Sequence, residues 1–251
     1  MQLKNKAKIY FLTGGVRSGK SQYGENLAGN LSCKVGYLAT AIITDEEMNK
    51  RILLHKKRRP ESWVTFELDN FKNLNNLNNL NNLNNFSSNN DSNDNFYSFS
   101  KIDDIAEANL VETNVVENNL KAIKEIFNSV VKLKLEVLIV DCVTNLLFRL
   151  INSFNIDGSL EKSELIDNTL EEKIENVVKN FFNNFLELLT KLKKQSNVNV
   201  IIISNEVGMG LVPPNPLGRV FRDLQGEVNK KIAAVADEVL FFVSGVNIKI
   251  K

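Results

Sequence analysis

Short apolar runs alternate with longer stretches of helical period along most of this chain. The apolar runs lie at 9–12, 35–40, 62–67, 136–141, 198–203, 239–243 and 246–250, and the helical stretches at 21–28, 45–59, 116–130, 165–192 and 215–236. Strands that are apolar on both sides and alternate with helices are typical of a parallel sheet covered by helices. We therefore predict an α/β fold with a mostly parallel sheet and helices on both faces. The last two strands are predicted to form a hairpin around Ser244-Gly245.

One segment departs from both periods. Between 70 and 95 the composition changes to Asn with Leu74, Leu77, Leu80 and Leu83 at every third position. A period of three matches neither a helix nor a strand, and so few apolar groups do not offset the entropy of ordering a chain. We predict a flexible, low-complexity insertion at 70–113 within one domain that spans 1–251. A partner-binding arm is the alternative.

Composition narrows the classes of protein further. The 251 residues are 43% hydrophobic and 24% charged, which is typical of a globular protein, and the formal net charge of +1 gives no reason to expect nucleic-acid binding. No segment approaches the roughly 20 apolar residues that span a bilayer. Two cysteines, Cys33 and Cys142, are too few for a disulfide framework. We expect a cytoplasmic enzyme with no membrane span.

A phosphate-binding pattern, G-x-x-x-x-G-K-[ST], lies between the first strand and the first helix. Its residues, all predicted to bind nucleotide, are Gly14, Gly15, Val16, Arg17, Ser18, Gly19, Lys20 and Ser21. Backbone N–H groups and the helix N-terminus surround phosphate oxygens, the lysine adds a positive charge, and the Ser21 hydroxyl can bind Mg²⁺. The alternative is a chance Gly/Ser-rich turn, but the flanking strand and helix are those that the pattern requires. The sequence thus predicts a P-loop NTPase fold of the RecA-like type.

A carboxylate follows the most apolar strand. Residues 136–140 run directly into Asp141, and in P-loop folds such an aspartate holds Mg²⁺ beside the loop, in part through water. Taken alone, an aspartate at a strand end is more often a turn residue. With the loop upstream, we predict that Ser21 and Asp141 are the magnesium ligands.

Four blocks of this sequence together resemble one enzyme family, the bifunctional adenosylcobinamide kinase and adenosylcobinamide-phosphate guanylyltransferase of cobalamin biosynthesis. The blocks are TGGVRSGKS at 13–21, YLATA at 37–41 with DEEMNKRILLHKKRRPESW at 45–63, VTNLL at 143–147, and SNEVGMGLVPPNPLGRVFRDLQGEVNKKIAAVADEV at 204–239. The resemblance implies two reactions at one site. The substrate hydroxyl takes the γ-phosphoryl group of ATP or GTP, and a histidine then attacks the α-phosphorus of GTP. The guanylyl-histidine passes GMP to adenosylcobinamide phosphate, which gives adenosylcobinamide-GDP.

The resemblance also assigns residues. His55 is the only histidine and matches the family's nucleophile, so His55 and Lys20 are the expected catalytic residues. Without the family, a lone histidine on the apolar side of its helix is more often a packed one. The further nucleotide-binding residues that the resemblance implies are Ala39, Thr40, Ala41, Lys56, Arg59, Glu67 and Asp141.

Other polar residues carry less definite expectations. Lys57 and Arg58 are interpreted as a solvated helix end favoured by the helix dipole. Arg17 can neutralise phosphate charge, Arg219 and Arg222 either do so or pair within their helix, and Asn205 and Glu206 bind substrate or orient water in this interpretation.

The family further implies a homo-oligomer, specifically a trimer, with Mg²⁺, ATP, GTP, adenosylcobinamide and adenosylcobinamide phosphate as partners. Two other functions remain open from the sequence. One is a monofunctional P-loop kinase for a small alcohol, and the other is a nucleotide-binding regulator without enzymatic activity.

Overall fold

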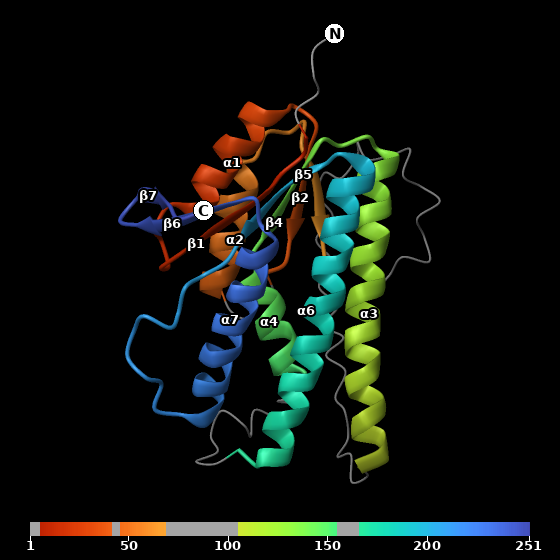
Figure 1. Cartoon of the computed structure of the whole chain (residues 1–251), viewed down its shortest axis with the longest axis vertical. Coiled ribbons are helices and arrows are strands. Elements are labelled where there is room, and N and C mark those ends of the chain that lie inside the picture. The colour runs from red at the N-terminus through yellow and green to blue at the C-terminus, as the bar shows by residue number, and fades with distance from the viewer. Residues whose placement is uncertain (1–5, 42–45, 69–104, 155–165) are drawn as a thin grey trace.

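A seven-stranded sheet runs through the part of the chain described by this computed structural model, which covers residues 6–41, 46–68, 105–154 and 166–251 (Figure 1). The strands are β1 Ile9–Gly14, β2 Val35–Ala39, β3 Val64–Glu67, β4 Val137–Asp141, β5 Asn199–Ile203, β6 Glu238–Val243 and β7 Val246–Lys249. The helices are α1 Lys20–Leu31, α2 Glu46–Arg58, α3 Ile105–Lys132, α4 Val143–Asn152, α6 Asn168–Ser196 and α7 Pro216–Val235.

The strand order confirms the predicted α/β fold of the P-loop type. The order is β3-β2-β4-β5-β1-β6-β7, and all neighbouring pairs are parallel except β6 and β7, which form the predicted antiparallel hairpin. Ser244 and Gly245 have φ values of 50° and 84°, as a tight hairpin turn of the primed type requires. Parallel strands all end at one edge, so the polar residues that follow β1, β2, β4 and β5 come together there.

Helices cover both faces of the sheet, as predicted. On one face α3, α4, α6 and α7 pack over the larger core, in which Phe181, Phe182 and Phe185 of α6 form a cluster with ring centroids 5.1–6.1 Å apart. On the other face α1 packs over a smaller core that includes Tyr37 and Phe242. Residues 137–140 of β4 have no exposed surface, which explains why this strand reads as an unbroken apolar run.

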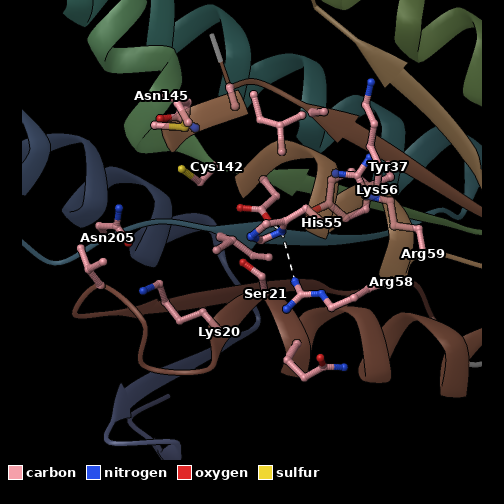
Figure 2. A pocket seen from close by; sticks show the side chains of 18 of the residues that line it. Lys20, Ser21, Tyr37, His55, Lys56, Arg58, Arg59, Cys142, Asn145 and Asn205 are labelled. Carbon is pink, nitrogen blue, oxygen red and sulfur yellow. Dashed lines mark hydrogen bonds and ion pairs between the residues drawn. The ribbon is translucent and has the colours of Figure 1, made fainter. Parts of the chain in front are cut away.

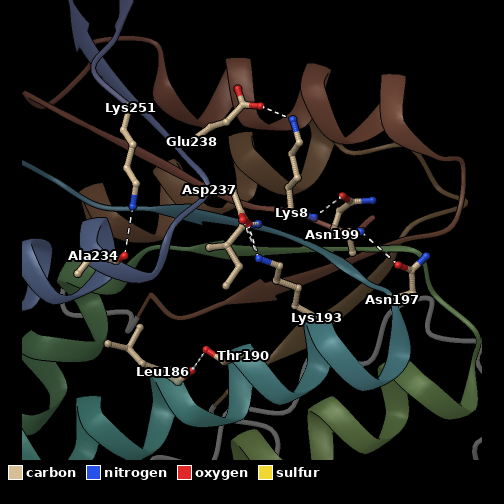
Figure 3. A network of polar contacts seen from close by, with 12 residues as sticks. Lys8, Leu186, Thr190, Lys193, Asn197, Asn199, Ala234, Asp237, Glu238 and Lys251 are labelled. Carbon is tan, nitrogen blue, oxygen red and sulfur yellow. Dashed lines mark hydrogen bonds and ion pairs between the residues drawn. The ribbon is translucent and has the colours of Figure 1, made fainter. Parts of the chain in front are cut away.

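The edge of the sheet at the amino ends of β1, β5 and β6 is tied together by polar contacts (Figure 3). Asp237 accepts from the backbone N–H of Ile9 at 2.7 Å and pairs with Lys193 of α6 at 2.6 Å, while Lys8 pairs with Glu238. Burial raises the pKa of Asp237, but the hydrogen bonds from Lys193 and Ile9 outweigh it, so the pKa lies below its ordinary value. These contacts fix the edge opposite the P-loop.

Two helices differ from the sequence expectation. Helix α3 begins at Ile105 instead of residue 116, so the last part of the segment predicted as an insertion is helical; the remainder, 70–104, lies outside the described residues. Helix α4 was not predicted, because it follows β4 after Cys142 alone, and that residue forms no side-chain cap. Among the described residues, no helix is long and apolar enough to cross a membrane.

Candidate active site

The P-loop joins β1 to α1 in a backbone path that glycine makes possible. Gly14 has φ 147° and Gly19 has φ 94°, a range that side chains with a Cβ rarely adopt. A Cβ at Gly14 would lie 2.3 Å from the carbonyl oxygen of Phe242 in β6, so the loop rests directly on that strand. Gly19 caps α1, and the first helical residue is Lys20.

Lys20 is buried and folds back over its own loop. Its Nζ donates to the carbonyl oxygens of Gly14 at 2.9 Å and Gly15 at 2.6 Å, and to Ser18 Oγ at 3.3 Å. Burial lowers the pKa of Lys20, while the nearby Cys142 and Asp141 act in the opposite direction. The three polar partners compensate for removing this charge from water.

A cavity of about 550 Å³ opens beside this loop and is lined by side chains from several helices and strands (Figure 2). The loop and α1 line it together with the carboxyl ends of β2, β3, β4 and β5, helix α2 and the start of α4. The predicted site residues that line it are Val16, Arg17, Ser18, Gly19, Lys20, Ser21, Ala39, Ala41, His55, Lys56, Arg59, Glu67 and Asp141. Gly14, Gly15 and Thr40 are predicted site residues that do not line it.

Thr40 instead holds two strand ends together. Its side chain is fully buried, and Oγ1 donates to the carbonyl oxygen of Cys142 and accepts from the Cys142 N–H, both at 2.7 Å. Its backbone N–H donates to the carbonyl oxygen of Asp141. Thr40 thus fixes the segment that presents Asp141 to the cavity.

Asp141 ends β4, and its carboxylate accepts a hydrogen bond from the Tyr37 hydroxyl at 2.5 Å. Burial and the neighbouring Asp141 charge raise the pKa of Tyr37 well above its ordinary value, so this phenol stays a donor. Burial likewise raises the pKa of the Cys142 thiol to about 12. Asp141 and the Ser21 hydroxyl supply two hard oxygen donors to the cavity, a set that suits Mg²⁺ shared with substrate phosphates.

His55 lies near the C-terminal end of α2 and is partly exposed. Its Nδ1 lies 4.0 Å from Asp141 Oδ2 and 3.1 Å from Nη2 of Arg58, as the dashed line in Figure 2 marks. The same Nη2 lies 3.2 Å from Glu25 of α1, a buried carboxylate. Burial raises the pKa of Glu25, and the Arg58 charge opposes the shift. Arg58 is therefore part of the site and not a solvated helix end, which the sequence interpretation missed.

Two further cations come from the same end of α2. Lys56 pairs with Glu67 of β3 at 2.5 Å. The Arg59 guanidinium lies 3.6 Å from the centroid of the Tyr37 ring. Nε and Nη1 of Arg59 are buried and make no hydrogen bond with the described residues, so these two nitrogens can donate to a ligand.

Sequence reasoning only partly identified the β5 side of the cavity. Asn205, expected there, lines the cavity together with Asn145 of the unpredicted α4. Behind them is a buried network in which Asn229 of α7 donates to the Asn205 carbonyl oxygen, and Gln225 donates to Ser204 Oγ, each at 3.0 Å. The sequence signal for this network was the presence of two polar residues, Gln225 and Asn229, on the apolar face of the helix predicted at 215–236. Glu206, Arg219 and Arg222 do not line the cavity.

The arrangement combines a phosphate-binding loop, an imidazole, several cations and a carboxylate within one cavity, which suits chemistry on a nucleoside triphosphate. Comparisons with known proteins agree. A sequence model described as "Cobinamide kinase / cobinamide phosphate guanyltransferase" (CobU) matches residues 10–85 and 111–250. The "Bifunctional adenosylcobalamin biosynthesis protein CobU" of Escherichia coli (strain K12) is 30% identical over 243 residues, which cover 97% of this chain and 99% of that protein.

The protein of the same name from Salmonella typhimurium (strain LT2) is 29% identical over the same shares of both chains. Among solved structures, a KaiC-like protein from Pyrococcus horikoshii OT3 matches with a TM-score of 0.40 and 13% sequence identity. The match covers 94% of this chain and 71% of that protein's chain. The family assignment therefore rests on the sequence matches. Those matches extend over nearly the whole chain and include the loop, α2 and the strand ends that build the cavity. This chain belongs to the cobinamide kinase / cobinamide phosphate guanyltransferase family.

Proposed function

We propose that this chain phosphorylates adenosylcobinamide with ATP or GTP and then transfers GMP from GTP to adenosylcobinamide phosphate through a guanylyl group on His55. The observation that carries the proposal is that the P-loop and the lone histidine of the chain line the same cavity. A kinase that transfers only a γ-phosphoryl group has no use for a nucleophilic side chain beside its phosphate loop. An imidazole there suits a covalent step.

In the kinase step, the substrate hydroxyl oxygen attacks the γ-phosphorus. The bond between the γ-phosphorus and the oxygen that bridges it to the β-phosphate breaks, and the hydroxyl proton is released. The loop N–H groups and Lys20 hold the triphosphate. Lys20 must exchange the carbonyl oxygens of Gly14 and Gly15 for phosphate oxygens, which are stronger partners for a cation. Ser21 and Asp141 would hold Mg²⁺, which supplies charge neutralisation to the phosphates.

In the transferase step, an imidazole nitrogen of His55 attacks the α-phosphorus, and the bond to the pyrophosphate oxygen breaks. A phosphate oxygen of adenosylcobinamide phosphate then attacks the same phosphorus, and the nitrogen–phosphorus bond breaks to restore the histidine. Lys56 and Arg59 line the cavity and can neutralise charge on the α-phosphate. The two unsatisfied nitrogens of Arg59 support a ligand contact at that position.

The test uses GTP labelled at the α-phosphorus, with Mg²⁺. The wild-type protein should acquire a label that is lost in acid and stable in base, and peptide mass spectrometry should locate GMP on His55. His55→Ala should bind GTP without becoming labelled. The matched control is Lys57→Ala, an exposed residue two positions away that does not line the cavity. If the wild-type protein phosphorylates adenosylcobinamide but never becomes labelled, the guanylyl-histidine step is refuted and only the kinase activity stands.

Assembly and location are further parts of the proposal. We propose a homo-oligomer, a trimer by family resemblance, in the cytoplasm. Val246 and Ile248 of β7 and Ile250, which follows this strand, are exposed apolar residues, and burial between subunits would remove them from water. Sedimentation velocity at several concentrations would reveal a trimer or refute it.

A further inference from the structure

Two groups of opposite charge face the same nitrogen of His55. Arg58 Nη2 lies 3.1 Å from Nδ1, within hydrogen-bonding distance, and Asp141 Oδ2 lies 4.0 Å from that atom, beyond it. Figure 2 shows the guanidinium and the imidazole turned toward each other. A side chain that binds Nδ1 favours one of the two positions of the ring proton.

The chemistry of the two partners is opposite. A guanidinium has only N–H donors, so Nδ1 must act as the acceptor in the Arg58 contact, and the proton of the neutral imidazole then sits on Nε2. A carboxylate has only acceptors, so contact with Asp141 requires the proton on Nδ1 and leaves the lone pair on Nε2. In the Arg58 contact, the Nδ1 lone pair points at a guanidinium and Nε2 is protonated. Neither nitrogen then presents a lone pair to a phosphorus atom.

We propose that Arg58 is a positioning residue that holds His55 in the non-attacking tautomer, and that nucleotide binding draws Arg58 to a phosphate and releases Nδ1 to Asp141. The inference rests on the proposed role of His55 as nucleophile. It assigns a function to a residue that sequence reasoning placed in solvent.

The contacts of Arg58 support such an exchange. Its Nη2 contacts both His55 Nδ1, at 3.1 Å, and a single oxygen of Glu25, at 3.2 Å. The guanidinium therefore does not form a paired, two-bond contact with the Glu25 carboxylate. A phosphate offers two or three oxygens that match the guanidinium fork, and charge-assisted pairs of this kind are the stronger ones. The Arg58 side chain is 41% exposed and also lines the cavity, so it can turn toward a phosphate there, at the cost of its contact with the buried Glu25.

The covalent step then balances with the chain's own groups. The proton on Nδ1 is held by Oδ2 of Asp141, which leaves Oδ1 of that carboxylate for Mg²⁺. The Nε2 lone pair forms the bond to the α-phosphorus while the bond to pyrophosphate breaks and its electrons leave with that group. The positive charge that develops on the ring lies next to the Asp141 carboxylate. Arg58, no longer beside the ring, does not oppose it.

The single histidine makes the tautomer directly measurable. With ¹⁵N-labelled histidine, long-range ¹H–¹⁵N spectra of the full chain at about pH 8.5, above the ordinary histidine pKa of about 6.5, report which nitrogen is protonated. Relative to wild type, Arg58→Ala should shift the tautomer ratio toward Nδ1–H by about tenfold, equivalent to about 1.4 kcal/mol. Arg58→Gln, which keeps a neutral donor, should shift it less. Lys57→Ala should leave it unchanged.

Adding GTP with a methylene group between its α- and β-phosphates, which cannot be cleaved there, should shift the wild-type ratio in the same direction. An unchanged ratio in both Arg58 variants overturns the inference, and so does an analogue that binds without moving the wild-type ratio. Failure of the proposed function looks different. The tautomer shifts would still occur, but no guanylyl group would form on His55 with GTP itself.

Discussion

Replacing Tyr37 with phenylalanine removes the hydroxyl that donates to Asp141 and keeps the ring in its place. Tyr37 is 1% exposed, so water cannot take over as the partner of the carboxylate from that side. A hydrogen bond to a charged group contributes about 1.5–3 kcal/mol. Tyr37→Phe should therefore lower the free energy of unfolding by about that amount, and lower the Tm by roughly 3–12 °C for a chain of this size.

The only tryptophan, Trp63, reports this change because it packs against the core cluster that contains Tyr37. Urea unfolding followed by its fluorescence should give a lower midpoint with an unchanged slope. The pH dependence has a defined sign. Since the pKa of Tyr37 is raised in the folded state, its neutral phenol stabilises the fold below about pH 10, the ordinary tyrosine pKa. The difference between wild type and Tyr37→Phe should shrink above that pH.

Tyr23→Phe is the matched control. Its ring packs edge-on against Phe242 at 5.2 Å, and its hydroxyl makes no hydrogen bond that the structure records among the described residues. This variant should unfold within about 0.5 kcal/mol of wild type. If Tyr37→Phe and Tyr23→Phe unfold at the same urea concentration, the Tyr37–Asp141 bond adds no net stability and the reasoning fails.

Three further substitutions test other parts of the structure. Lys20→Ala should reduce turnover by about 100-fold or more in steady-state assays, because the charge that neutralises the triphosphate is lost; a loss below about tenfold would contradict the predicted role. Phe185→Ala should destabilise the fold by about 3–5 kcal/mol in urea titrations, since it opens a cavity in the cluster on α6. Asp237→Asn should lower the free energy of unfolding by about 1 kcal/mol at pH 7, because the Asp237 side chain is partly exposed. The lowered pKa makes this stabilisation present above about pH 3.9 and lost as pH falls further, so the two proteins should converge in acid.

Local signals were enough to predict most of the fold. The fully buried run in β4 and the glycines of the loop leave a direct trace in the sequence, because backbone geometry and burial on both faces restrict the residue type. Helix α4 leaves little trace, since it follows β4 without a linker and without a side-chain cap. The start of α3 was predicted too late because its first turns continue an Asn-rich region.

The roles of residues that belong to a local sequence motif could be predicted from the sequence. The roles of residues that depend on a partner far away in the sequence were predicted less well. Arg58 reads as one of four consecutive cations until Glu25, 33 residues earlier, is known to lie beside it. Thr40 reads as a residue of a ligand crevice, but its hydroxyl is used by Cys142, 102 residues later. Such pairings depend on how α1, α2, β2 and β4 come together, which no local pattern encodes.

The close packing of Gly14 against Phe242 determines when, during synthesis of the chain, the phosphate-binding loop can reach its final structure. Strand β1 lies between β5 and β6, so β1 has no partner strand until residues 199–203 have been synthesised, and the loop lacks the support of Phe242 until β6 follows. A nascent chain still attached to the ribosome therefore carries the phosphate-binding residues long before it can bind nucleotide. We therefore expect nucleotide affinity to appear late in translation, where it can serve as a marker of a fully assembled sheet.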